Sequence, residues 1–165
     1  MSNSHDDHKN TAIESRPVTP DTVFEDKALR ELYAYWSKVA GDDAIPQKSN
    51  FELIDLLDVS SEILILDLVS PGLDFRFRLV GTDIIDRLGV DPTGDLISSY
   101  PLNAFWMSAI EICRRVVLER RPYWRPPLSS SYPDKSFLTV QAVVLPLLND
   151  TGDVTRIVGL MHYGD

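Results

Sequence analysis

Apolar residues recur with two different spacings along this chain, and the spacing separates predicted helices from predicted strands. Between residues 22 and 40 the apolar positions are three or four residues apart, as on one face of a helix: Leu29, Leu32, Tyr33, Trp36 and Val39. Thr22 and Glu25 have the spacing of a capping box, and Gly41 supplies a helix stop. The pattern predicts an N-terminal amphipathic helix over residues 22–40.

The next apolar segments are shorter. A second capping-box spacing at Ser49 precedes a short predicted helix that ends near Asp58. Residues 62–70 and 74–80 are rich in Ile, Leu, Val and Phe and flank Pro71-Gly72, which predicts a β-hairpin. In the second strand of this hairpin, one set of alternating positions is apolar and is predicted to face the core: Phe75, Phe77 and Leu79.

The second half of the chain predicts one long helix and three strands. Residues 82–88 predict a helical turn. Asn103 is the expected cap of a helix of about 17 residues that must stop before Pro122 and that carries its apolar residues along one face. Three strands, joined by segments rich in turn-forming residues, end the chain: residues 123–131, 137–147 and 156–163. These reversals indicate antiparallel pairing, and we expect the helices on one face of the sheet.

The first 21 residues differ from the rest because they are almost entirely polar. Only Ala12, Ile13 and Val18 are available for burial, too few to offset the conformational entropy lost on ordering the segment. We expect a mobile tail over residues 1–21 and a single domain over residues 22–165.

Composition and charge narrow the function. The 16 basic and 25 acidic residues give a formal net charge of -9, which argues against binding of nucleic acid and of anionic membranes. We expect a cytoplasmic protein, because no apolar run is long enough for a membrane helix and the polar start lacks a secretory apolar region. A single cysteine, Cys113, excludes an internal disulfide.

Two strands, a helical stretch that ends in a long helix, and three closing strands are the element order of a PAS domain. Local sequences narrow the likeness: residues 32–36 (LYAYW), 74–82 (DFRFRLVGT), 89–94 (GVDPTG) and 145–147 (LPL) ahead of Gly152. Over residues 28–163 the chain resembles one bacterial PAS subfamily, long described as domains of unknown function. That subfamily usually has an Arg-x-Asp segment where this chain has residues 47–50 (QKSN).

The resemblance implies an α+β fold with a five-stranded antiparallel sheet in the spatial order 2-1-5-4-3. Helices would lie on one face, in addition to the N-terminal amphipathic helix. PAS domains sense ligands, redox state or light, or they dimerise and dock on signalling partners. The family shares no catalytic residues, so the resemblance assigns none to this chain.

Cofactors of other PAS domains find no matching residues. Haem needs an axial ligand, usually a histidine near the long helix, and residues 82–122 contain no histidine. Flavin-binding PAS domains resemble one another around Asn-Cys-Arg, whereas Cys113 stands in residues 111–115 (EICRR). Motifs of hydrolases, P-loop nucleotide-binding proteins and metalloproteases are missing as well. We expect no catalytic, cofactor or metal site, and therefore a binding protein rather than an enzyme.

A ligand pocket would be enclosed by one face of the sheet and the apolar face of the long helix. The patterns select these candidates: Phe77, Trp106, Ile112, Val116, Trp124, Val143, Met161 and His162. The indole N–H groups of Trp106 and Trp124 would favour a small, mostly apolar ligand with an acceptor group. The same residues are equally consistent with a dry, fully packed core.

The predicted function is that of a stand-alone sensory or protein-interaction module in bacterial signal transduction. It would bind a small ligand, a signalling protein such as a histidine kinase or its regulator, or both. A homodimer is predicted through the N-terminal helix, whose packing on its own domain is the alternative; the candidate contacts are Leu29, Leu32, Tyr33, Tyr35 and Trp36. A ligand-free dimerisation scaffold and, less favoured, a small-molecule enzyme that uses the cavity stay open.

Overall fold

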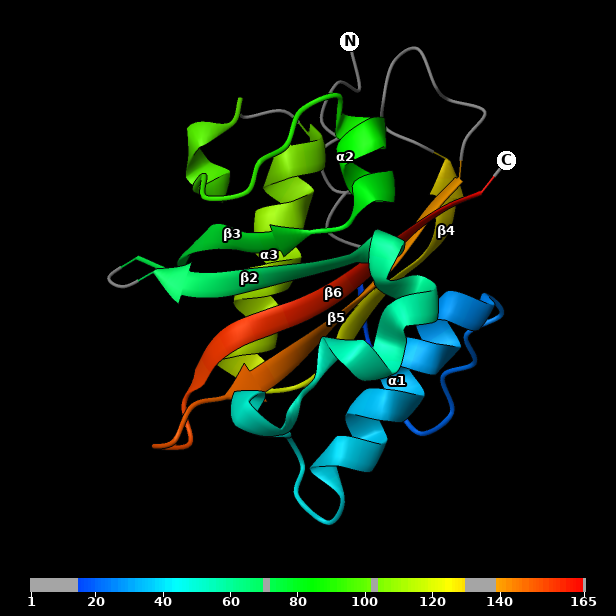
Figure 1. Ribbon diagram of the computed structural model, residues 1–165, viewed down its shortest axis with the longest axis vertical. Coiled ribbons are helices and arrows are strands. Elements are labelled where there is room, and N and C mark those ends of the chain that lie inside the picture. Colours follow the sequence, from blue (N-terminus) through cyan, green and yellow to red (C-terminus); the bar gives the residue numbers. More distant parts are fainter. Residues whose placement is uncertain (1–14, 70–71, 102–103, 130–138, 165) are drawn as a thin grey trace, which may run out of the picture.

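The computed structural model describes residues 15–69, 72–101, 104–129 and 139–164, and its strands form one antiparallel sheet. The order across the sheet is β1-β4-β5-β6-β2-β3 (Figure 1). The bounds are Arg16–Pro17 for β1, Ile63–Val69 for β2, Asp74–Val80 for β3, Tyr123–Ser129 for β4, Thr139–Leu148 for β5 and Val154–Gly164 for β6. The predicted order 2-1-5-4-3 is confirmed, because it corresponds to β3-β2-β6-β5-β4, and β1 adds an edge strand beside β4.

Helices of the described residues cover both faces of this sheet. Their bounds are Lys27–Ala40 for α1, Thr82–Leu88 for α2 and Ala104–Glu119 for α3, with 3-10 segments at Lys48–Asn50 (η2), Leu53–Glu62 (η3) and Ile97–Ser99 (η4). α3 packs on one face, and α1 and η3 pack on the other (Figure 1). The short helix predicted between Ser49 and Asp58 is instead formed by the two 3-10 segments η2 and η3. None of the helices named here is long and apolar enough to cross a bilayer.

Alternate residues of the central strands enter two separate hydrophobic cores. In β5, Val143 and Leu145 pack toward α1, whereas Val144 packs toward α3. In β6, Val158 and Ile157 divide in the same way. All five side chains are at most 8% exposed. Burial on both faces explains why these strands are apolar at consecutive positions rather than at alternate ones.

A β-bulge in β3 changes the facing of one predicted core residue. Two steps along β3, from Leu79 to Phe77, correspond to one step along β2, so Arg78 is an extra residue in the ladder. Phe75 and Phe77 are buried as predicted, whereas Leu79 is 37% exposed and lies toward η3 on the other face. The prediction that Leu79 faces the same core is wrong, because the alternation of the strand shifts at the bulge.

Residues 16–18 belong to the folded domain, although the polar sequence predicts a mobile tail there. β1 pairs with β4, and Val18 next to it is only 7% exposed. The expected tail over residues 1–21 is therefore corrected at its C-terminal end, where one apolar side chain and two paired residues fix the backbone. Residues 1–14, Pro71 of the expected turn and Asn103, the expected cap of the long helix, lie outside the described residues.

The N-terminal helix begins at Lys27, later than the predicted Thr22. Asp26 is its N-cap, and a carboxylate oxygen of Asp26 accepts a hydrogen bond from the N–H of Leu29 at 3.1 Å. The Thr22 hydroxyl instead accepts from the N–H of Thr19 at 2.9 Å and belongs to the preceding turn. Threonine and aspartate are both favoured N-cap residues, so the spacing alone did not distinguish the two positions.

A tight contact at Gly81 fixes the junction between β3 and α2. Its N–H donates to the carbonyl of Ile63 at 2.7 Å. A Cβ atom built at Gly81 would lie 2.2 Å from the carbonyl oxygen of Ser61 and 2.7 Å from that of Ser60. These are backbone atoms, so the end of η3 and the start of β2 would have to move to admit a side chain.

We therefore expect Gly81→Ala to destabilise the domain by about 1–3 kcal/mol, the usual cost of overpacking a close contact. Gly159→Ala is the matched control, because a Cβ there would meet its nearest neighbours at an ordinary 3.5 Å. Urea unfolding monitored by circular dichroism compares the two. Equal stabilities of the two variants would contradict the argument.

Candidate ligand-binding cavity

A cavity of about 90 Å³ lies between α3 and the sheet, with α2 and η4 at its border. Helical residues on its wall include Ile84, Leu88, Ile97, Trp106, Ala109, Ile112 and Cys113, and strand residues include Leu64, Leu66, Phe77, Val144, Gly159 and Met161. Its volume is below the roughly 150 Å³ of a cavity that accepts benzene and the roughly 300 Å³ at the low end of ligand pockets. Only a very small molecule fits without side-chain movement.

Few polar groups reach this cavity. Arg125 of β4 is the one charged side chain among the described residues that line it, and Ser15 and Ser108 add hydroxyl groups. Arg125 immediately precedes Pro126 and Pro127, where the register between β4 and β5 shifts. Prolines lack the N–H that a regular ladder needs, so the bulge is the position in β4 that tolerates them. An apolar wall with a few donors suits a mostly apolar molecule that carries an acceptor group.

Aromatic rings support one wall of the cavity. Phe77 and Trp106 line it and meet edge to face, with their centroids 6.2 Å apart. Tyr100 stacks on Trp106 at 4.5 Å and donates its hydroxyl hydrogen to Asp95 at 2.8 Å. Burial, assisted by the hydrogen bond and charge of Asp95, raises the pKa of Tyr100 to about 12. The hydroxyl therefore stays protonated at neutral pH and holds this wall in place.

Asp74 connects the start of β3 to η4. Its carboxylate accepts hydrogen bonds from the hydroxyl and the N–H of Ser98 and from the N–H of Phe75. Burial alone raises the pKa of Asp74, but these hydrogen bonds and the charge of Arg114 outweigh burial and lower the pKa below its ordinary value. The ionised carboxylate thus holds η4, which contributes Ile97 to the cavity wall.

Cys113 of α3 is a buried wall residue of the cavity. Burial raises the pKa of its thiol to about 12. The thiol is therefore protonated at neutral pH, and because thiolates are the reactive form, it is chemically quiet in the folded protein. Since the chain contains a single cysteine, this thiol can report on access to the cavity.

The structure brings four of the eight predicted pocket residues to the cavity from the α3 face, namely Phe77, Trp106, Ile112 and Met161. Val143 also borders the cavity, although it belongs to the core on the α1 face. Val116 is fully buried in the core between α3 and the sheet, away from the cavity wall. Trp124 packs in the core under α1, and His162 contacts Asp26 at the N-terminus of α1. These two candidates are corrected, because alternation shows which residues share a face but not which face meets α3.

Sequence reasoning also missed wall residues. Arg125 and Gly159 were not predicted, and neither were Ile84 and Ile97 of the short elements α2 and η4. If the other set of alternating positions in β4 had been assigned to the cavity, Arg125 would have been predicted in place of Trp124. The alternation in β4 was therefore visible in the sequence, but it did not show which set faces the cavity. The short elements gave no such signal, because their positions depend on contacts with the sheet.

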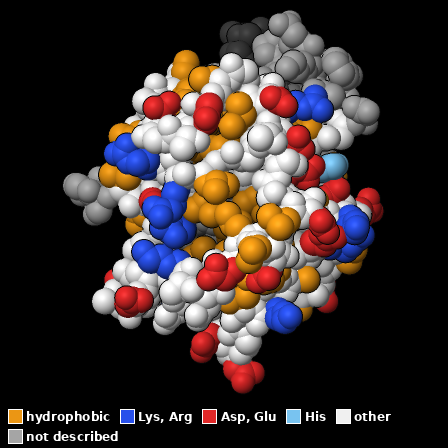
Figure 2. Space-filling view, in the orientation of Figure 1, with side chains coloured by type: hydrophobic (Ala, Val, Ile, Leu, Met, Phe, Trp, Pro, Cys, Tyr) orange, Lys and Arg blue, Asp and Glu red, His pale blue; other side chains and the backbone are white. Residues whose placement is uncertain are grey.

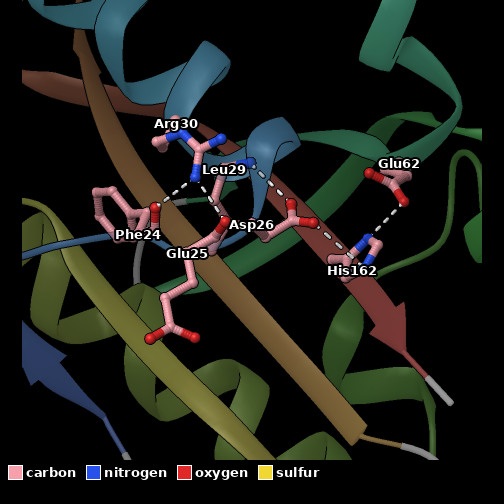
Figure 3. A network of polar contacts seen from close by, with 7 residues as sticks. All are labelled: Phe24, Glu25, Asp26, Leu29, Arg30, Glu62 and His162. Carbon is pink, nitrogen blue, oxygen red and sulfur yellow. Dashed lines mark hydrogen bonds and ion pairs between the residues drawn. The ribbon is translucent and has the colours of Figure 1, made fainter.

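His162 of β6 bridges two carboxylates on the α1 face of the sheet (Figure 3). Its Nδ1 lies 2.8 Å from Glu62 at the end of η3, and its Nε2 lies 3.3 Å from Asp26, the N-cap of α1. These three side chains are of the types that bind metal ions, and one ligand atom of each lies within 4.8 Å of the others. The contact with Glu62 is a hydrogen bond, and the contact with Asp26 is within ion-pair distance, so the ring joins β6 to both η3 and α1.

The candidate dimer helix uses its apolar stripe inside its own domain. Leu29 and Leu32 are fully buried and Trp36 is 5% exposed, whereas Tyr33 and Tyr35 are partly buried against the same core. The stripe therefore follows the alternative of packing on the domain itself. While α1 stays on the sheet, its three most buried stripe residues cannot contact a second copy.

Comparison with known proteins agrees with this fold. A family model described as "PAS domain" matches residues 24–162, which is most of the chain. This chain belongs to the PAS domain family, and a sensory module is the general role of such a domain. No curated protein matches the sequence significantly.

Solved structures with similar architecture include two light-oxygen-voltage (LOV) proteins. The light-state structure of the Aureochrome1 LOV photoreceptor is 14% identical, with a TM-score of 0.45 over 69% of this chain and 90% of that chain. The structure of an RNA-binding LOV receptor is 15% identical, with a TM-score of 0.45 over 90% of this chain and 37% of that chain.

We expect Asp74→Asn to lower the stability of the domain at pH 7 by about 1 kcal/mol, because the hydrogen bonds then go to a neutral acceptor. A lowered pKa in the folded state gives stability that is present at neutral pH and is lost as the pH falls below about 4. The difference between Asp74→Asn and the unchanged protein should therefore shrink in acid.

Denaturant unfolding at pH 7 and pH 3 measures this difference. Asp150→Asn is the control, since Asp150 is exposed and makes no hydrogen bond or ion pair with the described residues. An Asp74→Asn deficit that stays constant down to pH 3 would contradict the assignment.

Proposed function

We propose that this PAS domain is a sensor that binds a small, mostly apolar ligand with an acceptor group in the cavity under α3. The observation that carries the proposal is the wall itself, which is apolar apart from Arg125 and two serine hydroxyls among the described lining residues. Binding is favoured over catalysis because no histidine or carboxylate is among those residues, so a general base is missing at the cavity.

The route from the cavity to a partner follows β6. Met161 lines the cavity, and His162, the next residue, points to the opposite face and contacts Asp26 and Glu62. A ligand that prefers a widened cavity shifts the population toward states in which β6 and α3 are displaced. The bridge at His162 carries such a displacement to α1 and η3.

The output is proposed to be a protein contact in bacterial signalling. A histidine kinase or its regulator, acting in the cytoplasm, is the partner class that we expect from the superfamily. A homodimer stays a prediction, and analytical ultracentrifugation measures it. A ligand-free scaffold is the second candidate, because the cavity of about 90 Å³ is small enough to remain a packing defect.

The ligand proposal is tested with three very small probes that join an apolar body to an acceptor group: acetone, propionate and butyrate. Cys113 should react with DTNB about 100-fold more slowly in the folded protein than in urea, because burial blocks access and keeps the thiol protonated. A probe that occupies the cavity should slow the reaction further. At a hundredfold excess over its Kd, it should stabilise the fold by about 2.7 kcal/mol.

Gly159→Ala supplies the matched variant for this test. Its methyl group would project beside Leu64 at the cavity wall without a clash, so the fold should persist while probe affinity falls. Native mass spectrometry of freshly purified protein shows any retained ligand. If no ligand is retained and no probe changes stability or thiol reactivity, the protein is a ligand-free scaffold and the sensor proposal is wrong.

A further inference from the structure

Large apolar side chains gather in a surface groove between η3 and the end of β3. Ile54 is 71% exposed, Leu57 is 66% exposed and Leu79 is 37% exposed. Together with Ile63 and Val80 they line a hollow of about 480 Å³. Figure 2 shows hydrophobic side chains collected in the middle of this face. We call Ile54, Leu57 and Leu79, with the hollow between them, the η3 groove.

Two backbone irregularities create the η3 groove. The bulge at Arg78 turns Leu79 away from the core that holds Phe77. Within η3 the backbone departs from helical geometry at Leu56, which is 5% exposed while its neighbour Leu57 points outward. Exposing contiguous apolar side chains costs free energy in water, and such patches on folded domains mark interaction sites.

Positive charge borders the groove. Arg76 and Arg156 flank Asp67 across neighbouring strands, and the bulged Arg78, 56% exposed, contacts Asp67 at 3.2 Å. Arg156 also contacts Asp67, at 2.8 Å, whereas the guanidinium of Arg76 donates to the carbonyl of Gly94. Two arginines thus contact one aspartate on a chain whose net charge is -9. In Figure 2 basic side chains lie on the left of the hydrophobic area, and acidic side chains lie below it and to its right. Electrostatic complementarity at this border calls for acidic groups on the occupant.

We propose that the η3 groove docks an amphipathic helix of a partner protein. The apolar stripe of that helix packs on Ile54, Leu57 and Leu79, and its acidic flank faces the exposed Arg78. A hollow suits a helix better than a flat bilayer, and the net charge of -9 opposes an anionic membrane surface. The proposal deepens the partner side of the proposed function.

The test uses two synthetic 18-residue helical peptides with the same leucine stripe, one flanked by glutamate and its twin by lysine. Fluorescence anisotropy of the labelled peptides should show at least tenfold tighter binding of the glutamate peptide. Ile54→Asp with Leu57→Asp should abolish binding, and Arg78→Glu should remove the preference for glutamate. Higher salt should weaken binding of the glutamate peptide, because its contacts with the arginine side chains at the border of the groove are exposed to solvent.

Leu118→Asp is the matched control, since Leu118 is 67% exposed on α3, and it should bind like the unchanged protein. Circular dichroism melts verify that each variant is folded. Equal binding of the two peptides, no binding of either, or equal loss in Leu118→Asp overturns the proposal. So does groove-dependent binding to vesicles with 30% anionic lipid, or self-association that Ile54→Asp removes. Because the cavity lies across the sheet from the groove, a failed ligand test leaves this result unaffected.

Discussion

The pairing of β5 with β6 is the contact on which the rest of the structure depends. This pair spans most of both strands, and consecutive residues of each enter opposite cores. Val144 and Ile157 face α3, and Val143 and Val158 face α1. The two helices therefore pack on opposite faces of the same two strands. A sheet that is buried on both faces makes the two cores mechanically dependent on each other.

The two faces of the sheet carry different sites. The α3 face holds the cavity and its apolar wall, and the α1 face holds the His162 bridge and the η3 groove. In the proposed function, ligand and partner never compete for the same surface. They communicate through the strands between them, because a densely packed sheet moves as a unit rather than deforming locally.

The element order was predictable from local signals, namely apolar periodicity and turn-forming residues. The strand order was predictable only through the resemblance to PAS domains, because the pairing of β2 with β6 joins segments that are far apart in the sequence. Details that depend on a partner segment were not predictable. Leu79 points away from the core because of a bulge whose position depends on the register with β2. Trp124 and His162 lie on the α1 face, and alternation alone does not show which face of a strand meets which helix. Asp26 rather than Thr22 caps α1, a choice that the contact with His162 favours.

Asp26 connects α1 to the sheet. One carboxylate oxygen accepts from the N–H of Leu29 and caps the start of the helix, while the other faces His162. The same side chain therefore stabilises the helix and attaches it to β6. In the proposed function, a ligand beside Met161 changes the position of β6 and, through the contact of His162 with Asp26, the attachment of α1.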